Sequence, residues 1–106
     1  MAGKGMTKTE EVLIKTQDVS VRILLLAPRE IAPWHYHREI TDNMFCLSGQ
    51  LEVQLQDPAQ TLSLQPGQRC EVSPGRIHRV INPTDQEARY LLVQGVGTYD
   101  FNVVGE

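Results

Sequence analysis

The sequence predicts an all-β fold, an antiparallel sandwich or barrel of about ten short strands. Three observations support this. Short runs of aliphatic and β-branched residues recur along the chain, and turn signals separate them roughly every 6–12 residues. Apolar residues nowhere recur at helical spacing over the length of a helix. With 106 residues, the chain has room for one domain of ordinary size.

The first half of the chain is expected to form five strands. Gln50–Gln56 has the clearest pattern, because Leu51, Val53 and Leu55 alternate with polar residues and so share one face. The tight turn Ser48-Gly49-Gln50 precedes it. In chain order the five expected strands are Val12–Ile14, Val19–Ala27, Ile31–Arg38, Asp42–Ser48 and Gln50–Gln56.

The second half is divided by four turns that each contain a proline. These turns are Asp57–Gln60, Gln65–Gln68, Ser73–Gly75 and Asn82–Asp85. The expected strands between and after them are Leu62–Leu64, Arg69–Val72, Ile77–Ile81, the longer apolar run Glu87–Val96, and Tyr99–Val104.

The first nine residues show no periodicity. We expect residues 1–9 to be a flexible tail, partly vector-derived with a native start at Met6, and residues 10–106 to be a single barrel domain.

The charge balance disfavours two classes of partner. Lys plus Arg is 10 and Asp plus Glu is 13, which gives a net charge of −3 without a basic cluster. This argues against nucleic acid or a membrane as the main partner. Two cysteines do not make a disulfide framework, and neither a signal peptide nor a spanning apolar run is evident. The expected location is the cytoplasm.

The three histidines of the chain suggest a metal site. His35 and His37 are two residues apart, so on a strand both imidazoles project from the same face. Asp42 follows where the next strand begins, and His78 follows the Ser73–Gly75 turn. Imidazole and carboxylate ligands suit divalent iron, manganese, nickel or zinc.

Two segments that contain these residues resemble the two sequence motifs of the cupin superfamily. His35-Tyr-His37-Arg-Glu-Ile-Thr-Asp42-Asn-Met-Phe-Cys-Leu-Ser-Gly49 resembles the first, G-x5-H-x-H-x3–4-E-x6-G. Residues 67–82, with Pro74, Gly75, His78 and Asn82, resemble the second, G-x5-P-x-G-x2-H-x3-N. The short spacer between the motifs is similar to that of small single-domain bacterial cupins.

Three positions depart from the family pattern. Arg29 stands where the first motif opens with glycine, and Ser73 stands where the second has proline. Asp42 stands where the family usually has a ligand glutamate. The shorter Asp42 side chain either binds the metal directly or only orients a histidine through a hydrogen bond. Glu39 is a substitute carboxylate if the strand of His35 and His37 continues.

The resemblance implies an antiparallel double-stranded β-helix, the jelly-roll barrel of cupins, usually built as a homodimer. It implies one divalent metal ion held by His35, His37, His78 and, if it is a ligand, Asp42. Strand parity places Met44 and Cys46 with Asp42, and Val80 and Asn82 with His78, so these four should line the pocket. Whether Tyr90 and Tyr99 also reach the pocket is left open by the sequence.

Two classes of function fit a small-molecule pocket with a metal. The first is a metal-dependent enzyme, either a dioxygenase or an isomerase, with open coordination positions for a substrate. The alternative is a non-catalytic module that binds a small molecule or a metal. A structural dimer with a vestigial site is the third reading, which the use of all three histidines in the motifs disfavours.

Overall fold

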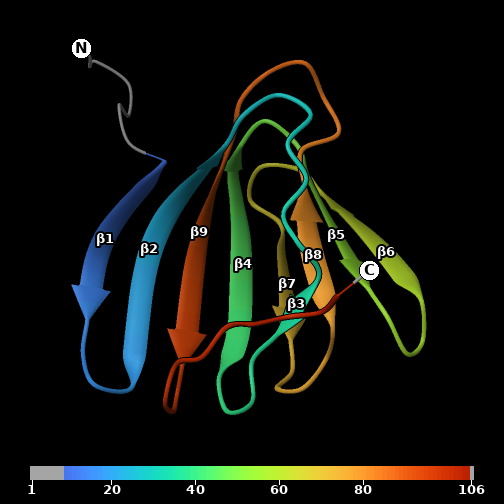
Figure 1. Cartoon of the computed structure of the whole chain (residues 1–106). Coiled ribbons are helices and arrows are strands. Elements are labelled where there is room, and N and C mark those ends of the chain that lie inside the picture. The colour runs from blue at the N-terminus through green and yellow to red at the C-terminus, as the bar shows by residue number, and fades with distance from the viewer. Residues whose placement is uncertain (1–8, 106) are drawn as a thin grey trace.

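The computed structural model describes residues 9–105, which form two antiparallel sheets of five strands each (Figure 1). The predicted all-β fold of ten strands is confirmed. The strands are β1 (Glu10–Lys15), β2 (Val19–Leu26), β3 (His35–Tyr36), β4 (Thr41–Ser48), β5 (Leu51–Leu55), β6 (Gln60–Leu64), β7 (Arg69–Val72), β8 (His78–Ile81), β9 (Ala88–Gly95) and β10 (Asn102–Val103). None of the described segments forms a helix with the length and hydropathy needed to cross a membrane.

The two sheets face each other and enclose the core. Their orders are β1-β2-β9-β4-β7 and β10-β3-β8-β5-β6. Every second residue of β4, β5 and β9 is buried, as expected for strands with one face toward a core. The predicted alternation in Gln50–Gln56 is confirmed, because Leu51, Val53 and Leu55 are all buried.

The third strand is shorter than expected. Of the predicted Ile31–Arg38, only His35–Tyr36 is a strand, and Ile31 makes an isolated bridge with Ile81. Pro33 lies between these two contacts and has no N–H to donate to a ladder, so pairing is interrupted there. The last strand is likewise shorter than Tyr99–Val104. The expected tail of residues 1–9 lies, apart from Thr9, outside the described residues.

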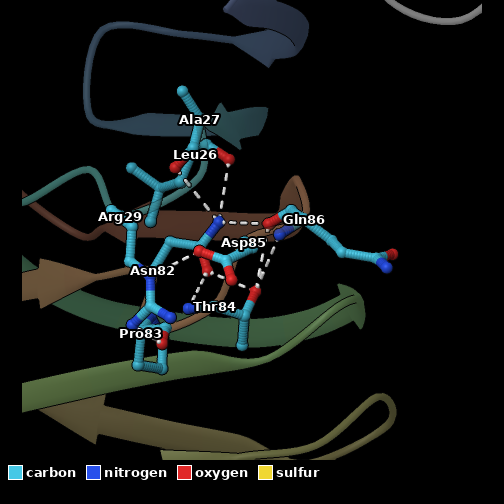
Figure 2. A network of polar contacts seen from close by, with 8 residues as sticks. All are labelled: Leu26, Ala27, Arg29, Asn82, Pro83, Thr84, Asp85 and Gln86. Carbon is cyan, nitrogen blue, oxygen red and sulfur yellow. Dashed lines mark hydrogen bonds and ion pairs between the residues drawn. The ribbon is translucent and has the colours of Figure 1, made fainter.

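The backbone at Arg29 has the conformation expected of the glycine that usually occupies this position of the cupin motif. Its φ of 64° lies in the left-handed region that favours glycine, the residue of the motif at this position. The arginine side chain adds contacts that glycine lacks. It donates to the Pro83 carbonyl at 2.6 Å and to the Asp85 carboxylate at 2.8 Å (Figure 2).

Asn82 connects this loop to the barrel and is fully buried. Its amide nitrogen lies within hydrogen-bond distance of the carbonyls of Leu26, Ala27 and Gln86, at 3.2, 3.1 and 2.6 Å (Figure 2). Its side-chain oxygen accepts from the Thr84 N–H and hydroxyl. One amide therefore joins the end of β2 to the loop between β8 and β9.

Replacing Asn82 with alanine should destabilise the fold, because it removes the donor of the buried Leu26 carbonyl and the link from β2 to the loop after β8. We expect Asn82→Ala to lower the free energy of unfolding by about 2–4 kcal/mol. Asn102→Ala, which removes two hydrogen bonds of a half-buried side chain at an edge strand, serves as the control. Urea denaturation followed by circular dichroism measures both, and equal losses would show that the Asn82 network does not stabilise the fold.

Candidate metal centre

The three histidines and Asp42 come together between the two sheets. His35 on β3 and His78 on β8 stand directly opposite each other in an antiparallel pair, and His37 follows β3. Asp42 comes from β4 in the facing sheet. All four are buried, and one potential ligand atom from each lies within 4.8 Å of the others.

The backbone fixes the orientation of all three imidazoles. The Nδ1 atoms of His35, His37 and His78 lie 2.9, 2.6 and 2.8 Å from the carbonyl oxygens of Pro33, Asp100 and Arg76. A carbonyl can only accept, so each Nδ1 carries a hydrogen and donates it. In a neutral imidazole the lone pair is then on Nε2, which is the usual arrangement of a metal-ligating histidine.

Two of these Nε2 atoms face the same carboxylate oxygen. Asp42 Oδ2 lies 3.0 Å from His78 Nε2 and 3.2 Å from His37 Nε2, and the His37 contact lacks hydrogen-bond geometry. A lone pair cannot face a carboxylate without a cation between them, either a proton or a metal ion. Atoms bound at about 2.1 Å to one ion are themselves separated by roughly 3.0–3.4 Å, so these separations fit a shared metal.

The pKa shifts indicate the same charge pattern. Burial is the main influence on His35 and lowers its pKa to about 4, against the hydrogen bond to Pro33. Burial also opposes ionisation of Asp42, but the contacts with His37, His78 and Gln94 outweigh it and lower the Asp42 pKa. For His37, the contact with Asp42 outweighs burial and raises the pKa. The site therefore holds an ionised carboxylate that requires positive charge.

A polar chain leads from Asp42 to the edge of the sheet. Gln94 on β9 donates its amide to Asp42 Oδ1 at 2.9 Å, and its carbonyl accepts from Arg22 on β2 at 2.6 Å. Arg22 also forms an ion pair with Glu10 on β1. Both oxygens of Asp42 thus have defined neighbours, and Gln94 orients the carboxylate toward the histidines.

A cavity of about 160 Å³ is lined by three of the four residues, His35, His37 and Asp42. Its walls come from both sheets and from the segment after β9. The lining residues are Arg22, Leu24, Ala32, His35, His37, Asp42, Met44, Val80, Tyr90, Leu92, Gln94, Tyr99 and Phe101.

Two of the four residues expected to line the pocket, Met44 and Val80, are found there, whereas Cys46 and Asn82 are not among the lining residues. Cys46 belongs to the hydrophobic core, with its thiol directed toward the carbonyls of Ser48 and Gly49. Asn82 serves the loop network described above. Parity assigned both to the inner face, where they are indeed buried, but burial between two sheets does not require contact with the cavity.

The sequence reasoning did not single out Arg22, Gln94 or Phe101. Two of them could have been found by parity, since Arg22 shares a strand face with Leu24 and Leu26, and Gln94 shares one with Tyr90 and Leu92. Phe101 had no such signal. It stacks on His35 with ring centroids 4.3 Å apart, because the C-terminal segment crosses from β9 to the other sheet (Figure 1). The same crossing places the ring of Tyr99 near that of His37, with their centroids 5.7 Å apart.

The barrel and its histidines agree with a match to a protein-family model. The model described as "Cupin domain" matches residues 22–94, well over half of the sequence. The chain therefore belongs to the cupin family, as its two motifs predict. No curated protein matches it.

Solved structures share the fold. A protein of Klebsiella pneumoniae described as an uncharacterized conserved protein with a double-stranded β-helix domain is 21% identical, with a TM-score of 0.78 over 90% of this chain and 77% of that chain. The polyketide cyclase RemF from Streptomyces resistomycificus is also 21% identical, with a TM-score of 0.78 over 92% and 70%. An oxalate oxidase is 17% identical, with a TM-score of 0.75 over 94% of this chain but only 57% of its own.

Removing the link between Arg22 and Asp42 should weaken metal binding. We expect Gln94→Leu to lower zinc affinity about 10–100-fold, because the carboxylate loses the donor that orients it. Gln54→Leu, a half-buried glutamine on β5, is the matched control. Competition against a chromophoric chelator measures both variants, and unchanged affinity in Gln94→Leu would contradict this role.

Proposed function

We propose that this cupin binds one divalent metal through Nε2 of His35, His37 and His78 and a carboxylate oxygen of Asp42. We further propose that it acts on a small molecule in the adjacent cavity as a metal-dependent dioxygenase. The observation that carries the proposal is that Nε2 of His37 and Nε2 of His78 lie 3.2 and 3.0 Å from one buried carboxylate oxygen. His35 belongs to the same cluster, and all three Nδ1 atoms are held by carbonyls. Asp42 serves as a ligand, the first of the two roles that the sequence left open.

The cavity favours an oxygenase over an isomerase. A proton-shift isomerisation needs a side chain that can accept a proton from the substrate. Among the described residues lining the cavity, Asp42 is the only carboxylate, and its contacts lower its pKa and so its basicity. Tyr90 and Tyr99 have pKa values raised by burial, and there is no lysine. The remaining bases that line the cavity, His35 and His37, are both proposed metal ligands.

Each part of the site then has a defined task. The metal would supply a Lewis acid and, as iron, a redox centre with positions open to small molecules. Leu24, Met44, Val80 and Leu92 exclude water and pack against the substrate. Phe101 and Tyr99 cover His35 and His37 at the end where the C-terminal segment crosses.

Metal analysis tests the centre. The protein, purified without a nickel column, should contain about one divalent ion per chain by elemental analysis. His35→Ala and Asp42→Asn should lose most of this metal, because each removes a ligand. Glu39→Gln is the control, since its carboxylate accepts from the Thr98 N–H at 3.1 Å instead of joining the cluster. A metal-free wild type after incubation with iron, manganese, nickel and zinc would refute the proposed centre.

Turnover separates the enzyme from a binding module. Oxygen uptake by the iron-loaded protein with small aromatic, thiol or carboxylic-acid substrates supports the dioxygenase. Bound metal and bound ligand without oxygen uptake or isomerised product would indicate the non-catalytic alternative.

We also propose that the protein is a homodimer that packs through the outer face of the sheet β1-β2-β9-β4-β7. Strand register places a row of apolar residues across this face: Ile23 beside Leu91, and Leu91 beside Phe45. A charged residue flanks this apolar row at each end: the acidic Glu11 on β1 lies beside Ile23, and the basic Arg69 on β7 lies beside Phe45. A two-fold rotation about an axis parallel to the strands places the acidic end of one row over the basic end of the other, with apolar residues between them. The face is therefore complementary to a second copy of itself.

We also propose a cytoplasmic location, with which the two buried, free cysteines agree.

A charge at the centre of this row should separate the subunits. We expect Leu91→Arg to be monomeric by light scattering after gel filtration, with an unchanged circular dichroism spectrum, while the wild type is dimeric. Val103→Arg, at an exposed apolar residue of the other sheet, should leave the dimer intact. A monomeric wild type at micromolar concentration would contradict the proposal.

A further inference from the structure

Arg22 is placed unusually for an arginine, because most of its side chain is buried and it lines the cavity beside the metal cluster. Two of its nitrogens have partners, the Gln94 carbonyl at 2.6 Å and the Glu10 carboxylate. Its Nε is buried and has no acceptor in the structure. A buried donor without an acceptor is costly, and a cavity ligand with an acceptor oxygen would remove that cost.

The charges around the cavity also favour an anion. Arg22 and Asp42 are the lining residues of formal charge, apart from any proton on the histidines. A divalent ion beside Asp42 leaves the cavity with net positive charge. Glu10 offsets part of it, but its side chain is 43% exposed, so water and salt screen its effect.

Three polar side chains of the cavity come from the paired strands β2 and β9: Arg22 from β2, and Tyr90 and Gln94 from β9. Tyr90 and Tyr99 line the same cavity as the guanidinium. Leu24, Met44, Val80 and Leu92 provide apolar walls. A cavity of about 150 Å³ holds a benzene molecule, so this volume of about 160 Å³ suits a ligand of roughly six non-hydrogen atoms.

We propose that Arg22 is the anion-binding residue of this site and that the natural substrate is a small carboxylic acid with a short apolar body. The guanidinium binds the carboxylate through its free Nε–H, and the body of the acid lies between the apolar walls next to the metal. This assignment rests on the proposed function, which it deepens by naming the substrate class. Arginine suits the role because its planar donors match a carboxylate.

Glu10 competes with such a ligand. It is the carboxylate that Arg22 already contacts, and it comes from the edge strand β1, all of whose residues are exposed. Removing its charge frees the guanidinium without changing the cavity walls. The structure thus provides a substitution that should strengthen binding and another that should abolish it.

The test compares butyrate with its neutral analogue butyramide by NMR titration of the zinc-loaded protein. We expect the wild type to bind butyrate at least tenfold more tightly than butyramide. Arg22→Gln should lose this preference, and Arg22→Lys should keep part of it. Glu10→Gln should increase butyrate affinity severalfold. Arg89→Gln is the matched control, because Arg89 also has a buried Nε without an acceptor but does not line the cavity.

Measuring zinc in every sample separates this proposal from the metal centre. If Arg22→Gln retains zinc and still prefers butyrate, the carboxylate is bound elsewhere, for instance by the metal, and the proposal is overturned. Equal binding of butyrate and butyramide by the zinc-loaded wild type overturns it as well. If the wild type fails to hold zinc, the metal centre is refuted, and the preference is then measured without metal: an Arg22-dependent preference supports this inference, and its absence overturns it. Arg22→Lys decides the question if Arg22→Gln does not fold.

Discussion

The buried carboxylate of Asp42 is the constraint around which the polar interior is arranged. Charge in an apolar core is unfavourable unless it is paired, and Asp42 is 2% exposed. Its partners come from both sheets: Gln94 from β9 beside it, and His37 and His78 from the sheet opposite. The geometry of the site therefore depends on how the two sheets pack against each other. A shift of one sheet against the other would leave the carboxylate unpaired as well as open the core.

The strands were predictable because their signals are local. Alternation in β5 and the proline-containing turns can be read within a few residues. For β2, β4, β5, β7, β8 and β9 the observed bounds lie within one residue of those expected. Prediction failed where the local signal was overridden. The run from Ile31 to Arg38 reads as one strand, but Pro33 interrupts its ladder, and only the two residues at His35 pair regularly. The left-handed backbone of Arg29 is likewise visible only in the structure.

The proposed ligands were predictable from the motifs, whereas their surroundings were not. Spacing brings His35, His37, Asp42 and His78 into consideration, and the structure places them in one cluster. The pairing of Gln94 with Asp42 depends on the register of β9 against β4, which no short segment encodes. Phe101 and Asp100 reach the histidines through a crossing from one sheet to the other, so their contribution depends on the complete topology. Parity could assign Asn82 to the interior but could not distinguish a cavity wall from a loop anchor.

The crossing of the C-terminal segment also makes the orientation of His37 depend on the rest of the fold. The hydrogen bond from His37 to the Asp100 carbonyl joins residues 63 positions apart, and the Gln94–Asp42 contact joins residues 52 apart. Closing loops of this length costs more conformational entropy than closing short ones, so these contacts are stable only when the rest of the barrel holds both ends in place. The imidazole of His37 therefore acquires its orientation only when the barrel is almost complete. At the proposed centre, a metal ion would therefore find its complete ligand set only in the finished barrel.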